Sequence, residues 1–193
     1  GSTSTYSSYD DRGVFNGCAS LSNVVFGAGL KTLNGHAFAN CTHLTRVVLP
    51  DNVETVANNC FISCTGLREV SFGAGIKSVG DYAFQVCTAL TNVTFAANST
   101  PQLAFGGYAF NGCSALETVT LPESLTAIGE YAFAGCSKLK RLRLPDSLTT
   151  LSLGAFGKCT SLGEVVLGDG VTSLGGSTST YSSYDDRGVF NGC

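Results

Sequence analysis

Tyrosine and aspartate side chains gather in one short segment of this 193-residue chain, in a pattern that suits contact with a ligand. The segment GSTSTYSSYDDR occupies residues 1–12 and returns unchanged at residues 176–187. Tyrosine gives a large contact area at low conformational-entropy cost, which is why antibody recognition loops are rich in tyrosine, serine and glycine. The expected contact residues are Tyr6, Tyr9, Asp10, Asp11, Tyr181, Tyr184, Asp185 and Asp186. The alternative interpretation of this composition is a solvated loop without a ligand.

Three arginines complete the expected binding residues, because a guanidinium group suits an acidic peptide or glycan. Arg141 and Arg143 lie in the most basic stretch of the chain, KLKRLR, and Arg46 stands at the position equivalent to Arg141 in an earlier repeat. The alternative is a solvated basic patch whose charge is balanced by Glu117 and Glu164.

Catalysis has little support in the sequence. The chain contains two histidines, His36 in a predicted surface column with Tyr82, Tyr108 and Tyr131, and His43 in a predicted turn. A serine nucleophile needs a histidine that is oriented by a third group, and the repeats offer no such arrangement. We therefore predict that the chain is not an enzyme and needs no cofactor.

Metal, nucleic-acid and membrane binding are also not expected. The adjacent aspartates lack the spaced oxygen ligands of a calcium loop, and the nine cysteines contain no CxxC pair for zinc. A formal net charge of -3 without a run of lysine or arginine argues against nucleic acid. No apolar run is long enough to cross a bilayer, so no membrane insertion is expected within this fragment.

Two nested repeats organise the chain that carries these residues. Residues 1–18 recur without change at residues 176–193, so the sequence holds one period of 175 residues (176 minus 1) and the start of the next. Cysteines divide the period into seven units, most of them 23 residues long. The cysteines are Cys18, Cys41, Cys64, Cys87, Cys113, Cys136, Cys159 and Cys193. Because the chain starts inside a repeat and has no methionine, we expect its native beginning to be missing.

Apolar residues hold fixed positions within each unit. A phenylalanine stands three residues before each of these cysteines, a leucine three residues after the first seven, and apolar residues six and eight after them. The last two positions alternate as in a β-strand, and repeats of this length predict a stacked solenoid. A cysteine beside the Phe and Leu columns is expected to be a buried free thiol. Bridges between coils are the alternative, since stacked strands lie about 4.8 Å apart.

Residues 131–151 illustrate the elements expected in one coil. The segment YAFAGC predicts one or two helical turns, and residues 139–144 predict a strand that Pro145 ends because proline has no amide to donate. A second short extended segment returns at residues 148–151. Polar insertions near residues 97–104 and at 176–187, the latter duplicated at 1–12, are expected to form surface loops, and the first of them to disrupt its return segment.

The combined pattern AFxxCxxLxxVxLPxxLxxI resembles the BspA-like, or Treponema-type, leucine-rich repeats over residues 13–174. The expected fold is an α/β repeat solenoid, a right-handed leucine-rich-repeat coil. It would carry a parallel sheet on one face and short helical turns on the other. Residues 1–193 would form a single domain of about seven coils.

The resemblance also implies a function. Members of this family are surface proteins, so we expect an extracellular or cell-surface module, displayed in tandem, that binds a protein or glycan in adhesion. The alternative is a structural spacer or a scaffold that associates end to end into a fibre, because neither terminus shows a polar capping repeat. A fold alone does not decide between these functions.

Overall fold

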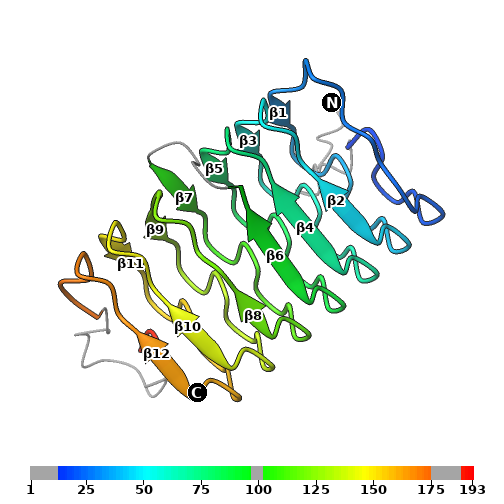
Figure 1. Ribbon diagram of the computed structural model, residues 1–193. Coiled ribbons are helices and arrows are strands. Elements are labelled where there is room, and N and C mark those ends of the chain that lie inside the picture. The colour runs from blue at the N-terminus through cyan, green and yellow to red at the C-terminus, as the bar shows by residue number, and fades with distance from the viewer. Residues whose placement is uncertain (1–12, 97–101, 175–187) are drawn as a thin grey trace, which may run out of the picture.

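The computed structural model describes residues 13–96, 102–174 and 188–193 of the 193-residue chain. The coils stack along one axis as a solenoid, and all strands pair in parallel (Figure 1). Strands of one face, the front face, are β2 (Arg46–Val48), β4 (Glu69–Phe72), β6 (Asn92–Phe95), β8 (Thr118–Val119), β10 (Arg141–Arg143) and β12 (Glu164–Val166). Strands of the second face, the return face, are β1 (Thr32–Leu33), β3 (Thr55–Val56), β5 (Ser78–Val79), β7 (Leu103–Phe105), β9 (Leu125–Ile128) and β11 (Thr150–Leu151).

The period of 23 residues sets the register on both faces. On the front face Arg46 pairs with Glu69 and Glu69 with Asn92, so equivalent positions of successive coils form straight columns. The front strands form a sheet of β2-β4-β6-β8 and a pair β10-β12, whereas the six return strands form one sheet. The predicted parallel pairing is confirmed. The predicted sheet on one face is present, and the short extended return segments form a second parallel sheet that the sequence analysis does not anticipate.

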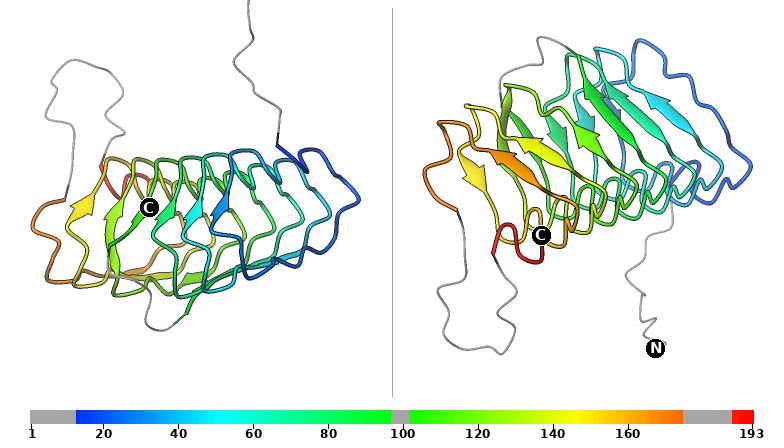
Figure 2. Two further views of the ribbon diagram at one scale, coloured as in Figure 1. Left: turned by 90° about the horizontal axis from the view of Figure 1, so that it is seen from above. Right: turned by 60° about the horizontal axis from the view of Figure 1, so that its bottom comes forward.

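The third side of each coil is formed by the roof turns, the residues that lead into each cysteine, seen edge-on in Figure 2. The prediction of helical turns here is wrong, since the described residues contain no helix. In the turns that lead into Cys41 through Cys159, the residues five and one before the cysteine have a left-handed backbone, for example Asn59 and Ser63, both with φ of 59°. A left-handed residue ends a right-handed helical turn at once. The apolar residues of the roof turn are therefore spaced as in a helix, although the backbone does not form one.

These left-handed residues direct alternate backbone amides toward the next coil. The amides of Phe61 and Ser63 donate to the carbonyls of Ala83 and Gln85, each at 2.8 Å. The amide of Ile62, between them, instead closes a local turn on the Asn59 carbonyl at 3.2 Å. The roof turns thus hold the coils together with backbone hydrogen bonds, as the two sheets do.

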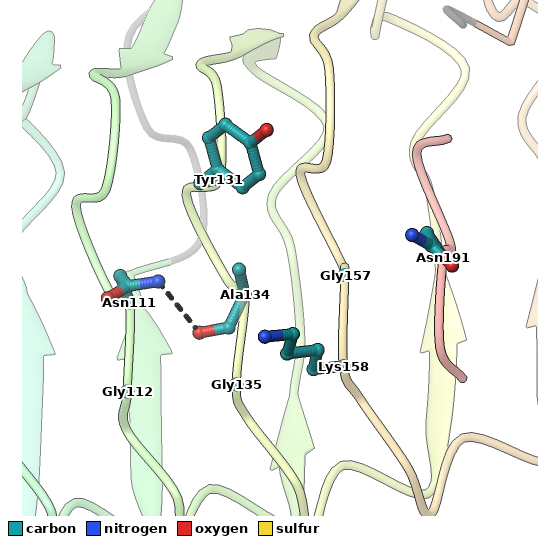
Figure 3. A pocket seen from close by; sticks show the side chains of 8 residues that line it. All are labelled: Asn111, Gly112, Tyr131, Ala134, Gly135, Gly157, Lys158 and Asn191. Carbon is teal, nitrogen blue, oxygen red and sulfur yellow. Dashed lines mark hydrogen bonds between the residues drawn. The ribbon is translucent and has the colours of Figure 1, made fainter. Parts of the chain in front are cut away.

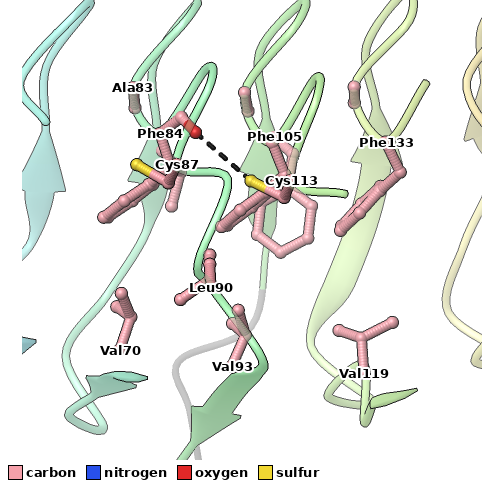
Figure 4. Packing of buried hydrophobic residues seen from close by; sticks show 14 of the residues in the cluster. Val70, Ala83, Phe84, Cys87, Leu90, Val93, Phe105, Cys113, Val119 and Phe133 are labelled. Carbon is pink, nitrogen blue, oxygen red and sulfur yellow. Dashed lines mark hydrogen bonds between the residues drawn. The ribbon is translucent and has the colours of Figure 1, made fainter. Parts of the chain in front are cut away.

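The interior is a stack of identical side chains from successive coils (Figure 4). The ring of Phe84 lies 5.1 Å from that of Phe61 and 5.2 Å from that of Phe110, in nearly parallel planes. Among the described residues, no polar or charged side chain is buried. This stack confirms that the Phe, Leu and Cys columns point into one shared core.

The cysteines of the described coils align in a row and carry free thiols. Each buried member of the repeat column donates its thiol to the carbonyl of the phenylalanine 26 or 29 residues earlier, as Cys64 does to Phe38 at 3.1 Å and Cys113 to Phe84 at 3.3 Å. Burial raises the pKa of these thiols, that of Cys64 to about 12. The expected buried free thiols are confirmed.

The predicted insertions lie largely outside the described residues, which exclude 1–12, 97–101 and 175–187. The end of the first insertion is described and corrects one expectation. The return segment of that coil is present as β7, and it pairs with β5 and β9. The pairing of β7 with β5 is regular, and the register shift between β7 and β9 arises because Thr126 of β9 is an extra residue between the partners of Leu103 and Ala104.

Candidate functional site

The eight tyrosines and aspartates predicted to contact a ligand, residues 6–11 and 181–186, fall outside the described residues. Their role stays a prediction. The structure does show where their segments attach. Gly13 begins the first roof turn and Gly188 begins the last one, so both segments lead into a roof turn rather than into a sheet.

The three predicted arginines lie on the front face and are each paired with a carboxylate. Arg141 and Arg143 project from β10 on one side, with Arg141 Nε 3.2 Å from Glu164 and Arg143 3.8 Å from Glu123. Arg46 projects from β2, and its Nε lies 3.2 Å from Glu69 on β4. These strands belong to earlier coils, so the structure does not bring Arg46 to the other two arginines. All three remain largely exposed. Each arginine is paired with a glutamate that neutralises its charge, so the three arginines do not form one concentrated basic site.

A ladder of three tyrosines runs along the edge of the roof turns. Tyr82, Tyr108 and Tyr131 stack with ring centroids 5.0 and 5.2 Å apart. All three have left-handed backbones, with φ of 59°, 57° and 53°, which fix the direction in which each ring leaves the coil. In the next coil the equivalent residue is Gly154. A Cβ there would lie 2.4 Å from the Tyr131 ring, so the missing side chain lets this ring lie flat over the coil.

Beside Tyr131 the roof surface is hollowed, with a volume of about 230 Å³ (Figure 3). Small residues form its floor, and the amide of Asn111 is held on one side by a hydrogen bond to the Ala134 carbonyl at 3.1 Å. Lys158 and Asn191 stand on the opposite side. The lining residues are Asn111, Gly112, Tyr131, Ala134, Gly135, Gly157, Lys158 and Asn191.

This arrangement combines an aromatic wall with polar groups that can bind an oxygen-rich or acidic group. Lys158 forms no ion pair with a described residue, so its ammonium group can serve a ligand. Desolvation and the neighbouring Tyr131, Tyr82 and Glu130 raise the pKa of Tyr108, which keeps its hydroxyl protonated as a hydrogen-bond donor. The chemistry is that of non-covalent recognition.

Other chemical groups do not assemble into a site within residues 13–96, 102–174 and 188–193. His43 lies 3.4 Å from the hydroxyl of its neighbour Thr42. His36 shares the column of the three tyrosines, as predicted, and like them has a left-handed backbone. No group of three metal-ligating side chains converges in this part of the chain. Within the same ranges, no helix has the length and apolar character of a membrane span.

Sequence reasoning placed the three tyrosines in one surface column with His36, but it missed the hollow beside them. The hollow arises because glycine and alanine occupy equivalent roof positions in consecutive coils, at Gly112, Ala134, Gly135 and Gly157. The bulkier Val86 holds the position of Gly112 in the preceding coil. A run of small residues down a repeat column is the pattern that could have revealed the hollow.

Comparison with known proteins agrees with this architecture. Among solved structures, the chain is similar to a leucine rich repeat protein from T. pallidum, with a TM-score of 0.56 and 26% identity. That match covers 63% of this chain and 68% of the other. It is also similar to a leucine rich cell surface protein from Faecalibacterium prausnitzii A2-165, with a TM-score of 0.56 and 23% identity, over 85% of this chain and 51% of that one. A search of curated proteins gave no match.

The repeat pattern itself matches a defined family. The description of that family is BspA type leucine rich repeat region, and six copies match over residues 11–107 and 102–184. These ranges include all the front strands and return strands described above, and every described roof turn except that of residues 188–193. The chain therefore belongs to the BspA-type leucine-rich repeat family.

Proposed function

We propose that the chain is an extracellular protein-interaction module that acts in adhesion. The observation that carries this proposal is the tyrosine ladder beside the hollow on the roof edge. Membership of a repeat family whose solved relatives include a cell surface protein supports the extracellular location. Family proteins are typically not enzymes, and the described residues offer recognition chemistry.

The ladder is ordered before a ligand arrives. Stacking on both sides and a fixed backbone leave the ring of Tyr108 little rotational freedom to lose on binding. Association normally costs about 0.5–1.5 kcal/mol for each flexible side chain that becomes immobilised, and a pre-stacked ring avoids much of that cost. Aromatic rings also dominate the contact energy of protein interfaces.

The ligand we favour is a protein segment with an acidic or carbonyl-rich group beside an apolar one. The apolar part would lie on the exposed edge of Tyr82 and its neighbours, and the polar part would reach Lys158 across the hollow. The predicted loop residues and the arginines on β10 are further proposed contacts. A glycan is the alternative ligand, because pyranose rings also pack on tyrosine.

Binding to arrays of extracellular-matrix proteins and of glycans tests this proposal. Tyr108→Asn removes the middle ring while keeping a residue that tolerates the left-handed backbone, as Asn59 does in the same column at φ 59°. We expect at least a tenfold loss of affinity for the bound array member. His36→Asn is the matched control, since it makes the same change at φ 57° outside the ladder, and it should bind like the parent.

A second variant separates the loops from the ladder. Deletion of residues 177–186 removes one predicted tyrosine-rich segment and leaves the described coils intact. Loss of binding in this variant alone would assign recognition to the loop. Equal binding by the parent and Tyr108→Asn would remove the ladder from the site.

A second proposed function, end-to-end self-association, is supported by apolar side chains that are exposed at the first and the last described coils. At the first coil, a hollow of about 380 Å³ is lined mainly by apolar side chains, and Val25 is 88% exposed. At the last coil, Val165 and Leu167 point along the core columns but are 36% and 45% exposed. Light scattering against concentration tests it, because a mass that does not change with concentration would contradict it.

A further inference from the structure

Lys158 has a strained backbone at a position where its neighbours in the repeat column are glycines. It stands one residue before a cysteine of the repeat, with φ of 59°. Gly135 and Gly192 hold the equivalent positions of the coils before and after it, at φ of 75° and 71°. A left-handed backbone costs free energy for a lysine and little for a glycine. Such strain is typical of positions where a side chain serves a binding site.

The Lys158 ammonium group is available to a ligand. The side chain extends over the hollow toward the preceding coil (Figure 3). Among the described residues it forms no ion pair, and none of those that line the hollow is acidic. A cation above an uncharged floor of glycine and alanine favours an anion from outside the chain.

The opposite wall of the hollow offers a second hydrogen-bond donor in a fixed orientation. Asn111 Oδ1 accepts from Gln85 Nε2 at 3.3 Å, and Asn111 Nδ2 donates to the Ala134 carbonyl at 3.1 Å. These two contacts fix which end of the Asn111 amide carries the oxygen, and they leave one N–H of Nδ2 for a ligand. Lys158 and Asn111 therefore both present donors to the hollow, which suits a ligand that only accepts.

The aromatic wall presents the edge of its ring and not a face. One face of the Tyr131 ring stacks on Tyr108 at 5.2 Å. The backbone of Gly154 occupies the other side, where a Cβ would lie 2.4 Å from the ring. A pyranose that stacks on tyrosine needs a free face, and Tyr131 has none to offer. The edge of an aromatic ring carries partial positive charge, so it favours an anionic oxygen instead.

We propose that the hollow binds the carboxylate of an aspartate or glutamate side chain from an acidic peptide segment, with Lys158 as its ion-pair partner. This inference rests on the proposed protein-interaction function and names the chemistry of the partner. Asn111 would donate a second hydrogen bond, and the Tyr131 edge would face the carboxylate. The volume of about 230 Å³ suits one side chain, because pockets that enclose a whole small molecule span about 300–1,000 Å³.

Lys158→Gly separates binding from folding. Glycine adopts φ of 59° without strain, so the variant should melt at or above the temperature of the parent while it lacks the ammonium group. Ser63→Gly is the matched control. It makes the same backbone change, also at φ of 59°, in the equivalent position of an earlier coil away from the hollow.

Fluorescence anisotropy with two labelled peptides measures the preference for a carboxylate. One peptide alternates glycine with glutamate, and the other alternates glycine with glutamine. The parent and Ser63→Gly should bind the glutamate peptide about tenfold more tightly, because hydrogen bonds to an ionised group are the stronger ones. Lys158→Gly should bind both peptides equally. An oligogalacturonate, which carries carboxylates on pyranose rings, should bind the parent no better than the glutamine peptide does.

Ala134→Gln tests whether the hollow itself is needed. The longer side chain would fill the floor while Lys158 stays in place, and Gln85 already holds the equivalent position two coils earlier. The variant should fold, as circular dichroism can verify, and lose the preference for glutamate. A preference that survives Ala134→Gln would mean that Lys158 acts as a surface charge without the hollow, which overturns the proposal.

Two further results would overturn it as well. A glutamate preference that persists in Lys158→Gly would place the acidic-peptide site elsewhere, and equal binding of both peptides by the parent would remove the site altogether. Tighter binding of the oligogalacturonate than of the glutamate peptide would assign the hollow to an acidic glycan.

The protein-interaction function is judged separately, by the arrays of matrix proteins. Array binding that depends on Tyr108 and not on Lys158 would keep that function and remove the carboxylate site. A parent that binds no array protein would remove the function, and the two peptides would still decide whether the hollow recognises a carboxylate.

Discussion

Replacing Phe84 by alanine should be the most damaging single truncation of the core. The side chain is fully buried and contacts three other rings, Phe61 and Phe110 in the stack and Phe72 edge-on at 5.8 Å. The left-handed residues Tyr82 and Val86 donate their amides to the next coil, and the carbonyls of Ala83 and Gln85 accept from the preceding coil. The backbone around Phe84 is thus held on both sides and cannot collapse into the space left behind. The cavity should therefore persist.

The magnitude follows from burial and ring contacts. Truncation of a buried phenylalanine costs about 3–5 kcal/mol, and each lost ring pair adds about 0.5–1.5 kcal/mol beyond area burial, so we expect the upper part of that range. For a chain of this size, each kcal/mol lowers the melting temperature by about 2–4 °C. Phe15→Ala is the matched control, because this ring is 44% exposed and stacks on Phe38 alone among the described residues. It should cost about 1–2 kcal/mol in proportion to its smaller burial.

Urea unfolding followed by far-ultraviolet circular dichroism measures both variants. A central cavity in a one-dimensional repeat also weakens the contact between neighbouring coils, so the Phe84→Ala transition should become broader as the array loses cooperativity. Equal losses for Phe84→Ala and Phe15→Ala would refute the reasoning, because the two positions differ only in burial and stacking. A loss below about 1 kcal/mol at Phe84 would refute it as well.

Three further predictions follow from the backbone and the thiols. Val86→Gly should raise the unfolding free energy by about 0.5–1 kcal/mol in urea titrations, since φ of 60° is strained for a β-branched residue and Gly112 fills the next equivalent position; a loss would contradict this. A thiol reagent applied to the folded protein near neutral pH should modify Cys18 and Cys193 and spare the seven buried cysteines until urea is added, which mass spectrometry can count. Burial raises the pKa of thiols such as Cys64 from 9.0 to about 12, so their contribution to stability is complete below about pH 9 and is lost as pH rises toward 12. Unfolding midpoints measured across that range should fall, and a midpoint that rises would contradict the assignment.

Much of the fold could be predicted because each core position repeats in every coil. Columns such as that of Phe61 and Phe84 appear in the sequence as fixed offsets from cysteine, and the structure stacks them. The roof turns could not be predicted in the same way. The dihedral angles of Asn59 and Ser63 depend on hydrogen bonds to the next coil, which apolar spacing does not encode.

The candidate site was predicted less completely than the core. The pairing of Arg141 with Glu164 follows from the register of the repeat and is the sequence-based alternative to a basic site, and the structure shows the pair at 3.2 Å. The hollow beside Tyr131 depends on glycines at roof positions of three consecutive coils. Because the chain has 24 glycines, these three do not stand out in the sequence. Charge and periodicity can be read from the sequence, but the volume of a surface hollow depends on how the coils stack in three dimensions.

The hydrogen bonds of the two sheets and of the roof turns run from coil to coil, along the solenoid axis. Force applied between the ends of the solenoid would therefore break these bonds one coil at a time, as in peeling, and not all together. Each freed coil of 23 residues can extend to roughly 75–80 Å, against a stacked rise of about 4.8 Å. A chain built in this way would lengthen stepwise under tension, and the coils that remain stacked would offer free strand edges on which the released coils could fold again.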